Sequence, residues 1–184
     1  MNETEILRLD LLSSILLDVN SELSKLRTTL ANAIKTMSVA DLTRHPEGKW
    51  STAEVLEHLW LTYSGTVKGC QRCLQSGKPL ANARTLKQRL AVAVVVGMGY
   101  LPSGREAPKG TRPRGESAEK ILAEIGPTIA ELDVLMSQCE SQYGTSTPVL
   151  DHPILGPLTT TQWRKFHWVH GRHHVKQILR LRGV

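Results

Sequence analysis

The chain has 184 residues, a length that suits one domain with a substantial core. Its formal charge of +6 arises late in the sequence, because residues 152–184 contain six Lys or Arg and no Asp or Glu. The longest apolar run, residues 90–98, is too short to span a bilayer, and the acidic, polar start does not resemble a signal peptide. We therefore expect a single domain over residues 1–184 that is cytoplasmic, does not associate with membranes and keeps its three cysteines as free thiols.

Apolar residues recur at helical spacing from the start of the sequence. A short amphipathic helix is expected within residues 2–19. A second, more regular helix should begin after Ser21, whose side chain can cap it, and should continue to residue 37. Residues 41–49 contain Pro and Gly and predict a loop.

The middle of the chain predicts two further helices and a long connection. Ser51 and Glu54 have the spacing of a capping box, which predicts a helix over residues 50–74. Another long helix is expected over residues 84–98. Residues 99–115 are rich in Gly, Pro, Arg and Lys, and long loops of this kind often cover or shape a site.

The last third predicts two more helices, and no segment of the chain reads as a convincing strand. Residues 117–139 form an apolar stripe at helical spacing, with a kink expected at Pro127. Residues 144–157 predict a second loop, after which Thr159 or Thr160 caps the final helix. The expected fold is all-α: a four-helix bundle with an additional short N-terminal helix and the long Pro- and Gly-rich loop.

The final helix contains four of the seven histidines. At about 100° per residue, one arc roughly 80° wide contains Trp163, His167, His170, His174, Ile178 and Leu181. A buried neutral imidazole still needs partners for both ring nitrogens, so a group of imidazoles in a core requires an explanation. Metal binding is the usual one.

Three motifs together resemble the DinB/YfiT-like superfamily of metalloenzymes. They read W-S-x-x-E-V-L-x-H-L at 50–59, H-P-I-L-G-P-L-T at 152–159 and Q-W-x-x-F-H-x-x-H-x-x-H-H-x-x-Q-I at 162–178. The resemblance covers nearly the whole chain. It implies a divalent metal near one end of a four-helix bundle, held by one histidine of the second bundle helix and an H-x3-H pair of the last. In this sequence those ligands are His58, His170 and His174.

Helical spacing agrees with this ligand set without singling it out. His170 and His174 lie one turn apart, so both imidazoles can reach one ion, and a third ligand must come from elsewhere. Pairing His167 with His170 or with His174 is not excluded by spacing. Three imidazoles and no carboxylate would leave a coordination position open, as in catalytic sites. Zinc and nickel suit such ligands best, with iron, cobalt or manganese as alternatives.

Other polar residues are candidates for supporting roles. His173 could transfer protons, and Gln177 could orient a neighbouring imidazole through a hydrogen bond. Glu54 is a candidate general base, although its capping role competes. The C-x-x-C at residues 70–73 lacks a second cysteine pair and is read as two buried helix thiols rather than a zinc or redox site. Cys139 carries no motif.

Such a site predicts a metal-dependent enzyme acting on a small molecule. Activation of a low-molecular-weight thiol would give an S-transferase, which the resemblance also implies, and activation of water would give a hydrolase. The competing class is a non-catalytic, stress-related bundle that binds a metal or small ligand, and a fourth protein ligand would favour it. A nucleic-acid-binding role rests on charge alone and ranks last. Trp168, expected to be exposed opposite the histidines, suggests a homodimer contact.

Overall fold

The computed structural model describes residues 21–102 and 106–182. The short helix expected within residues 2–19 therefore lies outside the described part. The elements in chain order are α2 (Glu22–Ile34), α3 (Val39–Thr43), α4 (Thr52–Ser76), α5 (Leu86–Val92), η1 (Ala93–Gly97), η2 (Lys109–Thr111), α6 (Ala118–Tyr143), β1 (Pro148–His152), β2 (Gly156–Thr159) and α7 (Thr160–Arg182).

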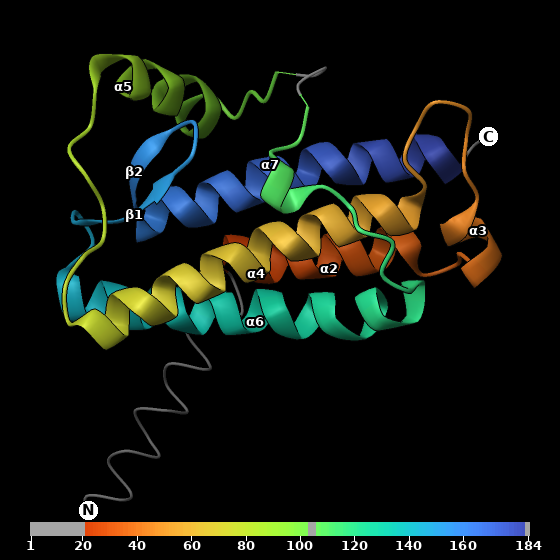
Figure 1. The fold of residues 1–184 in the computed structure, drawn as a ribbon, viewed down its shortest axis with the longest axis horizontal. Coiled ribbons are helices and arrows are strands. Elements are labelled where there is room, and N and C mark those ends of the chain that lie inside the picture. Colours follow the sequence, from red (N-terminus) through yellow and green to blue (C-terminus); the bar gives the residue numbers. More distant parts are fainter. Residues whose placement is uncertain (1–20, 103–105, 183–184) are drawn as a thin grey trace, which may run out of the picture.

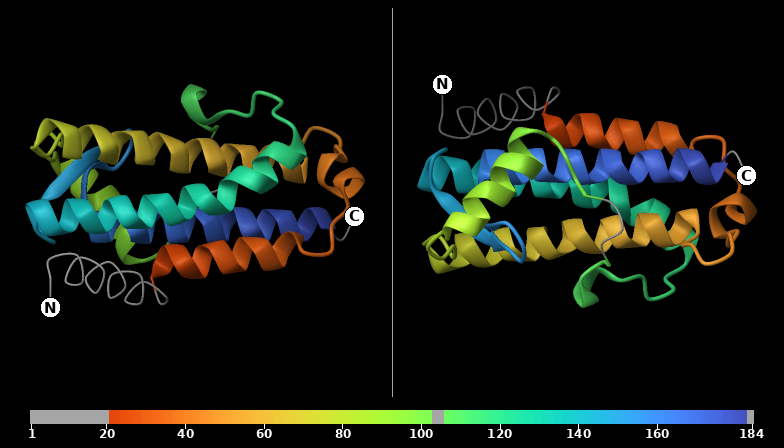
Figure 2. Two further views of the ribbon diagram at one scale, coloured as in Figure 1. Left: turned by 90° about the horizontal axis from the view of Figure 1, so that it is seen from below. Right: turned by 90° about the horizontal axis from the view of Figure 1, so that it is seen from above.

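The described residues are mostly helical, and four long helices, α2, α4, α6 and α7, lie side by side (Figures 1 and 2). Each buries an apolar stripe in a shared aliphatic core, and the most extensive contacts join α4 to α6 and α2 to α7. The pair α2 and α7 runs opposite to the pair α4 and α6 (Figure 1). Within the described residues, no helix has the length and hydrophobicity needed to cross a membrane.

The expected helix starts are confirmed. The Ser21 hydroxyl caps α2 by accepting from the Ser24 amide at 2.9 Å. At α4, the Ser51 amide donates to the Glu54 carboxylate at 2.8 Å while the Ser51 hydroxyl accepts from the Glu54 amide. Thr159 caps α7, because its hydroxyl accepts from the amide of residue 162 at 3.2 Å. Local sequence therefore sets where these three helices begin.

Two segments expected to be loops contain regular structure. Residues 39–43 form α3, because Ser38 and Asp41 make a further capping box and Leu42 is buried. The expectation of no strand is also wrong: β1 and β2 pair as an antiparallel hairpin. Burial does not alternate along either strand, and three prolines interrupt the segment, so the hairpin leaves no strand pattern in the sequence.

The segment expected to be a long helix over residues 84–98 is shorter and lies outside the set of four long helices, with η1 packed against α7. It begins at Leu86, capped by Thr85, and its last turn widens into the π-helical η1. It lies above the β-hairpin at one end of the molecule (Figure 1). By contrast, α6 continues through Pro127, so this proline does not end the helix.

Close packing holds α7 against α2. Gly171 is buried in the middle of α7, and a Cβ at this position would lie 2.3 Å from a methyl carbon of Leu26. A glycine is needed here because the Leu26 side chain occupies the space that a larger residue would fill. Since Gly171 follows His170 directly, the same contact sets how deeply this part of α7 lies in the core.

Candidate metal centre

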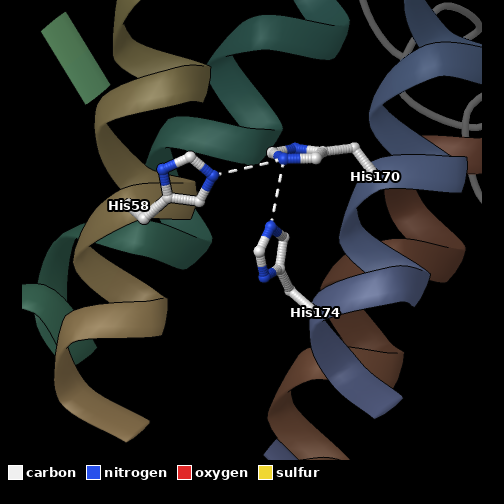
Figure 3. Close-up of side chains that lie close together, drawn as sticks. All are labelled: His58, His170 and His174. Carbon is white, nitrogen blue, oxygen red and sulfur yellow. Dashed lines mark hydrogen bonds between the residues drawn. The ribbon is translucent and has the colours of Figure 1, made fainter. Parts of the chain in front are cut away.

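Two helices bring together the three histidines predicted as metal ligands. His58 is in the second turn of α4, and His170 and His174 are one turn apart on α7. Their rings point toward one another (Figure 3). The Nε2 atom of His170 lies 3.2 Å from Nε2 of His58 and 3.1 Å from Nε2 of His174. One nitrogen from each of the three lies within 4.8 Å of the other two.

Hydrogen bonds on the far side of two rings set their tautomers. His58 Nδ1 lies 2.8 Å from the Thr111 carbonyl oxygen, and His174 Nδ1 lies 2.9 Å from Gln177 Oε1. A carbonyl oxygen can only accept, so the backbone contact requires Nδ1–H on His58; the Gln177 oxygen requires the same of His174. The Nε2 atoms of both rings then carry lone pairs that face His170. Metal-binding histidines are usually held in this way.

The spacing of these nitrogens suits a metal ion. Zinc–nitrogen bonds of about 2.0–2.1 Å in a tetrahedral site place ligand nitrogens about 3.3–3.4 Å apart, close to the two separations that involve His170. His170 Nδ1 is buried and has no hydrogen-bond partner among the described residues. If that nitrogen carries the ring proton, three lone pairs meet at one point, and a cation there would relieve their repulsion. The His58–His170–His174 cluster can therefore hold a metal ion.

Burial keeps these imidazoles neutral, the form that binds metals. Desolvation lowers the pKa of His58, against the opposing effect of its bond to Thr111. Burial, and then the neighbouring His58, lower the pKa of His174 to about 3. The pKa of His170 falls well below its usual value because of burial and the adjacent imidazoles.

A buried carboxylate beside the cluster anchors the long loop. Glu57 is 1% exposed and accepts from the backbone amides of Arg114, Gly115 and Glu116 at 2.7, 3.1 and 3.3 Å. The loop is thereby fixed to α4 one residue before His58. This attachment brings the Thr111 carbonyl to the His58 ring.

The other predicted site residues lie around the cluster without joining it. Gln177 Oε1 accepts from His174 Nδ1 at 2.9 Å, a contact through which Gln177 can orient this ring. His173 is half-buried, with its ring centroid 5.2 Å from that of His174. Glu54 is engaged in the α4 cap, and its carboxylate also lies 3.3 Å from His45 Nε2. The capping role considered for it from the sequence is therefore the one observed.

His167, the alternative ligand, points elsewhere. It is fully buried; its ring stacks on Trp163 at a centroid distance of 5.5 Å and meets Tyr63 edge-on at 5.3 Å. Within residues 21–102 and 106–182, neither of its ring nitrogens has a hydrogen-bond partner. Burial, with a smaller effect of His152, lowers its pKa to about 3. In this arrangement His167 is a neutral core residue outside the three-histidine cluster.

The cysteines and Trp168 complete the comparison with the sequence. All three cysteines are buried and free of disulfide bonds, as expected for residues 70–73. The expectation that Trp168 is exposed is wrong. It is half-buried against the core, and the guanidinium of Arg172 lies 5.3 Å from its ring centroid.

A cavity of about 840 Å³ opens beside the cluster. Its walls come from α4, α5, η1, the long loop, the β-hairpin and α7. They include His58, His170, His173, His174, Trp50 and Trp163. A cavity of this size is typical of small-molecule sites. The metal-ligand candidates therefore face a space that a small molecule can enter.

Sequence reasoning missed four residues around the site. Thr111 acts through its backbone carbonyl, which no side-chain pattern reveals, and Glu57 acts by holding the loop. Trp50 lies 5.4 Å from the His58 ring between centroids. His152 lies 4.4 Å from the Phe166 ring, and its Nδ1 accepts from two hairpin amides, those of residues 154 and 155. Its place in the H-P-I-L-G motif was the available signal.

Comparisons with known proteins give one result. Searches of the curated proteins and of the solved structures found no match. None of the comparisons links the chain to the DinB/YfiT superfamily. A family model described as "Protein of unknown function (DUF1569)" matches residues 20–180. Because this match spans most of the sequence, the chain belongs to the DUF1569 family.

Proposed function

We propose that this chain is a metal-dependent enzyme with a DinB-like four-helix bundle. His58, His170 and His174 would hold a divalent ion, zinc or nickel, beside a small-molecule site. The observation that carries the proposal is the convergence of three Nε2 atoms from α4 and α7 next to the cavity. Two of the rings have their Nδ1–H groups already bonded, as ligands require.

The donor set favours catalysis over a closed structural site. Among the described residues, the cluster contains three histidines and no carboxylate or thiolate. A three-histidine site leaves at least one coordination position for water or substrate. A fourth protein ligand would instead favour a non-catalytic metal-binding role.

A divalent ion held by His58, His170 and His174 would lower the pKa of a water or thiol bound to it, and would so supply a nucleophile at neutral pH. We propose that the reaction is either transfer of a low-molecular-weight thiol to an electrophile or hydrolysis. The chain's own residues would position the reactants. His173 lines the same cavity and can accept the proton released, while Gln177 keeps His174 oriented.

Metal content tests the site directly. The untagged protein should contain about one zinc or nickel per chain, as expected for one three-histidine site. His58→Ala, His170→Ala and His174→Ala should each lose it while keeping their helicity by circular dichroism. His167→Leu is the matched control, because His167 is one turn before His170 and outside the cluster; it should retain the metal.

Activity is tested with the metal-loaded protein. Several low-molecular-weight thiols should be offered with a chlorinated aromatic electrophile, and ester substrates should be offered without thiol. Release of chloride that depends on both thiol and metal supports the transferase, and metal-dependent ester cleavage supports the hydrolase. If the wild-type protein stays metal-free after reconstitution with zinc and nickel, the proposal is wrong.

A further inference from the structure

One face of α4 forms a continuous wall of the cavity. The residues of this wall follow helical spacing from the cluster to the far end: His58, Leu61, Gly65, Gly69 and Arg72. At about 1.5 Å per residue, the seven residues from His58 to Gly65 span about 10 Å and the fourteen from His58 to Arg72 about 21 Å. The cavity is therefore elongated along α4, with the metal-ligand candidates at one end.

The wall offers few free hydrogen-bonding groups between its ends. Thr62 and Thr66 also line the cavity, but their hydroxyls donate to the backbone carbonyls of residues 58 and 62, at 2.8 and 3.1 Å. Their methyl groups are what remain for a ligand. Between the histidines and the Arg72 guanidinium, α4 presents an essentially apolar strip.

The opposite walls are mostly apolar as well, although Glu106 and Asp151 also line the cavity. They include Leu90 of α5, Val94 of η1 and Ile154 of the β-hairpin. Leu90 is 70% exposed and Ile154 is 51% exposed, although both side chains line the cavity. Apolar side chains that remain exposed around a concave site are typical of a binding site for an apolar ligand.

Gly65 keeps this strip open. A Cβ built at Gly65 meets no atom within 4 Å, whereas one built at Gly69 would lie 2.9 Å from a Leu150 methyl carbon. Packing therefore accounts for the glycine at 69 but not for the one at 65. Glycine in a helix interior is less stable than alanine, so space for a ligand is a physical reason for Gly65.

We propose that the cavity binds an elongated small molecule whose polar head binds the metal ion and whose apolar body lies along α4 past Gly65. The polar head sits at the three-histidine cluster, and the body extends for about 10 Å or more toward Arg72. This assignment of substrate class rests on the proposed metal site. Gly65 is its specificity-determining position, since a side chain there would shorten the cavity.

A homologous series of alkyl hydroxamates tests the inference, because the head binds metals and only the chain length varies. Cobalt- or zinc-loaded protein is titrated with members from acetohydroxamate to octanohydroxamate, following the cobalt absorption or the fluorescence of Trp50 and Trp163, which line the cavity. Affinity should rise by up to about fourfold per added methylene if each is fully buried. Equal affinity across the series would overturn the inference while leaving the metal site intact.

Variants at Gly65 test where the alkyl chain of the ligand lies in the cavity. A leucine at this position should lean toward the preceding turn, and thus toward His58. Gly65→Leu should therefore bind octanohydroxamate about tenfold more weakly or worse, while acetohydroxamate affinity changes less than about twofold. Gly65→Ala, which improves helix propensity, controls for stability and should retain most of the chain-length dependence.

The outcomes separate the two proposals. If Gly65→Leu binds metal and every hydroxamate with the same affinity as the wild type, the alkyl chain of the ligand does not lie along α4 and the inference fails. If no hydroxamate binds and no metal is retained by the wild type, the metal-site proposal fails first.

Discussion

The His170 ring lies between the other two imidazoles of the cluster, but it is not the residue that orients them. It is the middle member of the cluster, with its Nε2 within 3.2 Å of both other Nε2 atoms. Its Nδ1 has no hydrogen-bond partner in the part of the chain that the structure describes. His58 and His174, by contrast, each use Nδ1 to bond an oxygen acceptor. Orientation of the site therefore depends on those two acceptors, the Thr111 carbonyl and Gln177.

Gln177→Leu should weaken metal binding by about 10- to 100-fold. The substitution removes the oxygen that holds the His174 ring, so the ring is free to rotate away from the ion. Competition with a chromophoric chelator measures the change. Gln177→Glu restores an acceptor and should bind metal within about tenfold of the wild type; equal affinities for Gln177→Leu and the wild type would contradict this role.

At the scale of elements, the long loop is part of the site because α4 holds it. Glu57 and His58 are adjacent on α4, and both bond backbone groups of residues 111–116. The loop also forms part of the cavity wall. Loss of the Glu57 contacts should therefore affect both loop order and the orientation of His58.

Glu57→Ala should make the loop more sensitive to trypsin at Lys109 and Arg114 and should lower metal affinity by about tenfold. Three backbone amides lose their shared acceptor, and the Thr111 carbonyl is no longer held beside His58. Limited proteolysis and chelator competition measure the two effects. Glu116→Ala is the control, because the Glu116 side chain pairs with Lys120 at the surface. If trypsin cleaves Glu116→Ala as fast as Glu57→Ala, Glu57 does not hold the loop in the way proposed.

At the scale of the whole molecule, the basic last helix is partly neutralised by the helices around it. Arg164 bonds Asp133 at 2.9 Å and Glu140 at 2.6 Å, both on α6. Lys165 lies 3.3 Å from Glu22 of α2. The same packing buries several imidazoles together, and this makes stability depend on pH.

The metal-free protein should lose stability as the pH falls below about 6.5, the ordinary pKa of histidine. Burial lowers the pKa of His152 to about 4 and those of His167 and His174 to about 3 in the folded chain. Between these values and about 6.5, the unfolded chain binds protons that the folded chain does not, so acid favours unfolding. Each such imidazole contributes up to about 1.4 kcal/mol per pH unit.

Urea unfolding with a chelator present, at pH values of about 7.5 and 5, measures this dependence. The free energy of unfolding should be clearly smaller at the lower pH. His167→Leu should reduce the difference, since it removes one buried imidazole. Equal free energies of unfolding at the two pH values would contradict the prediction that the buried imidazoles destabilise the folded chain in acid.

The sequence by itself determined the features that depend on neighbours along the chain. Ser51, Glu54 and Thr159 predicted helix starts correctly, because a cap is formed within one turn. Helix geometry likewise placed His170 and His174 within reach of one ion, although it did not exclude His167. Apolar periodicity was also sufficient to predict a mostly helical protein.

Only the tertiary structure decided which segments meet. It brought His58 beside the α7 pair and turned His167 toward Tyr63 instead, which spacing along one helix cannot distinguish. It also placed the backbone carbonyl of Thr111 at the cluster and the weakly patterned residues 148–159 in a hairpin. These features depend on contacts between residues far apart in the chain, and local propensity and periodicity carry no information about such contacts.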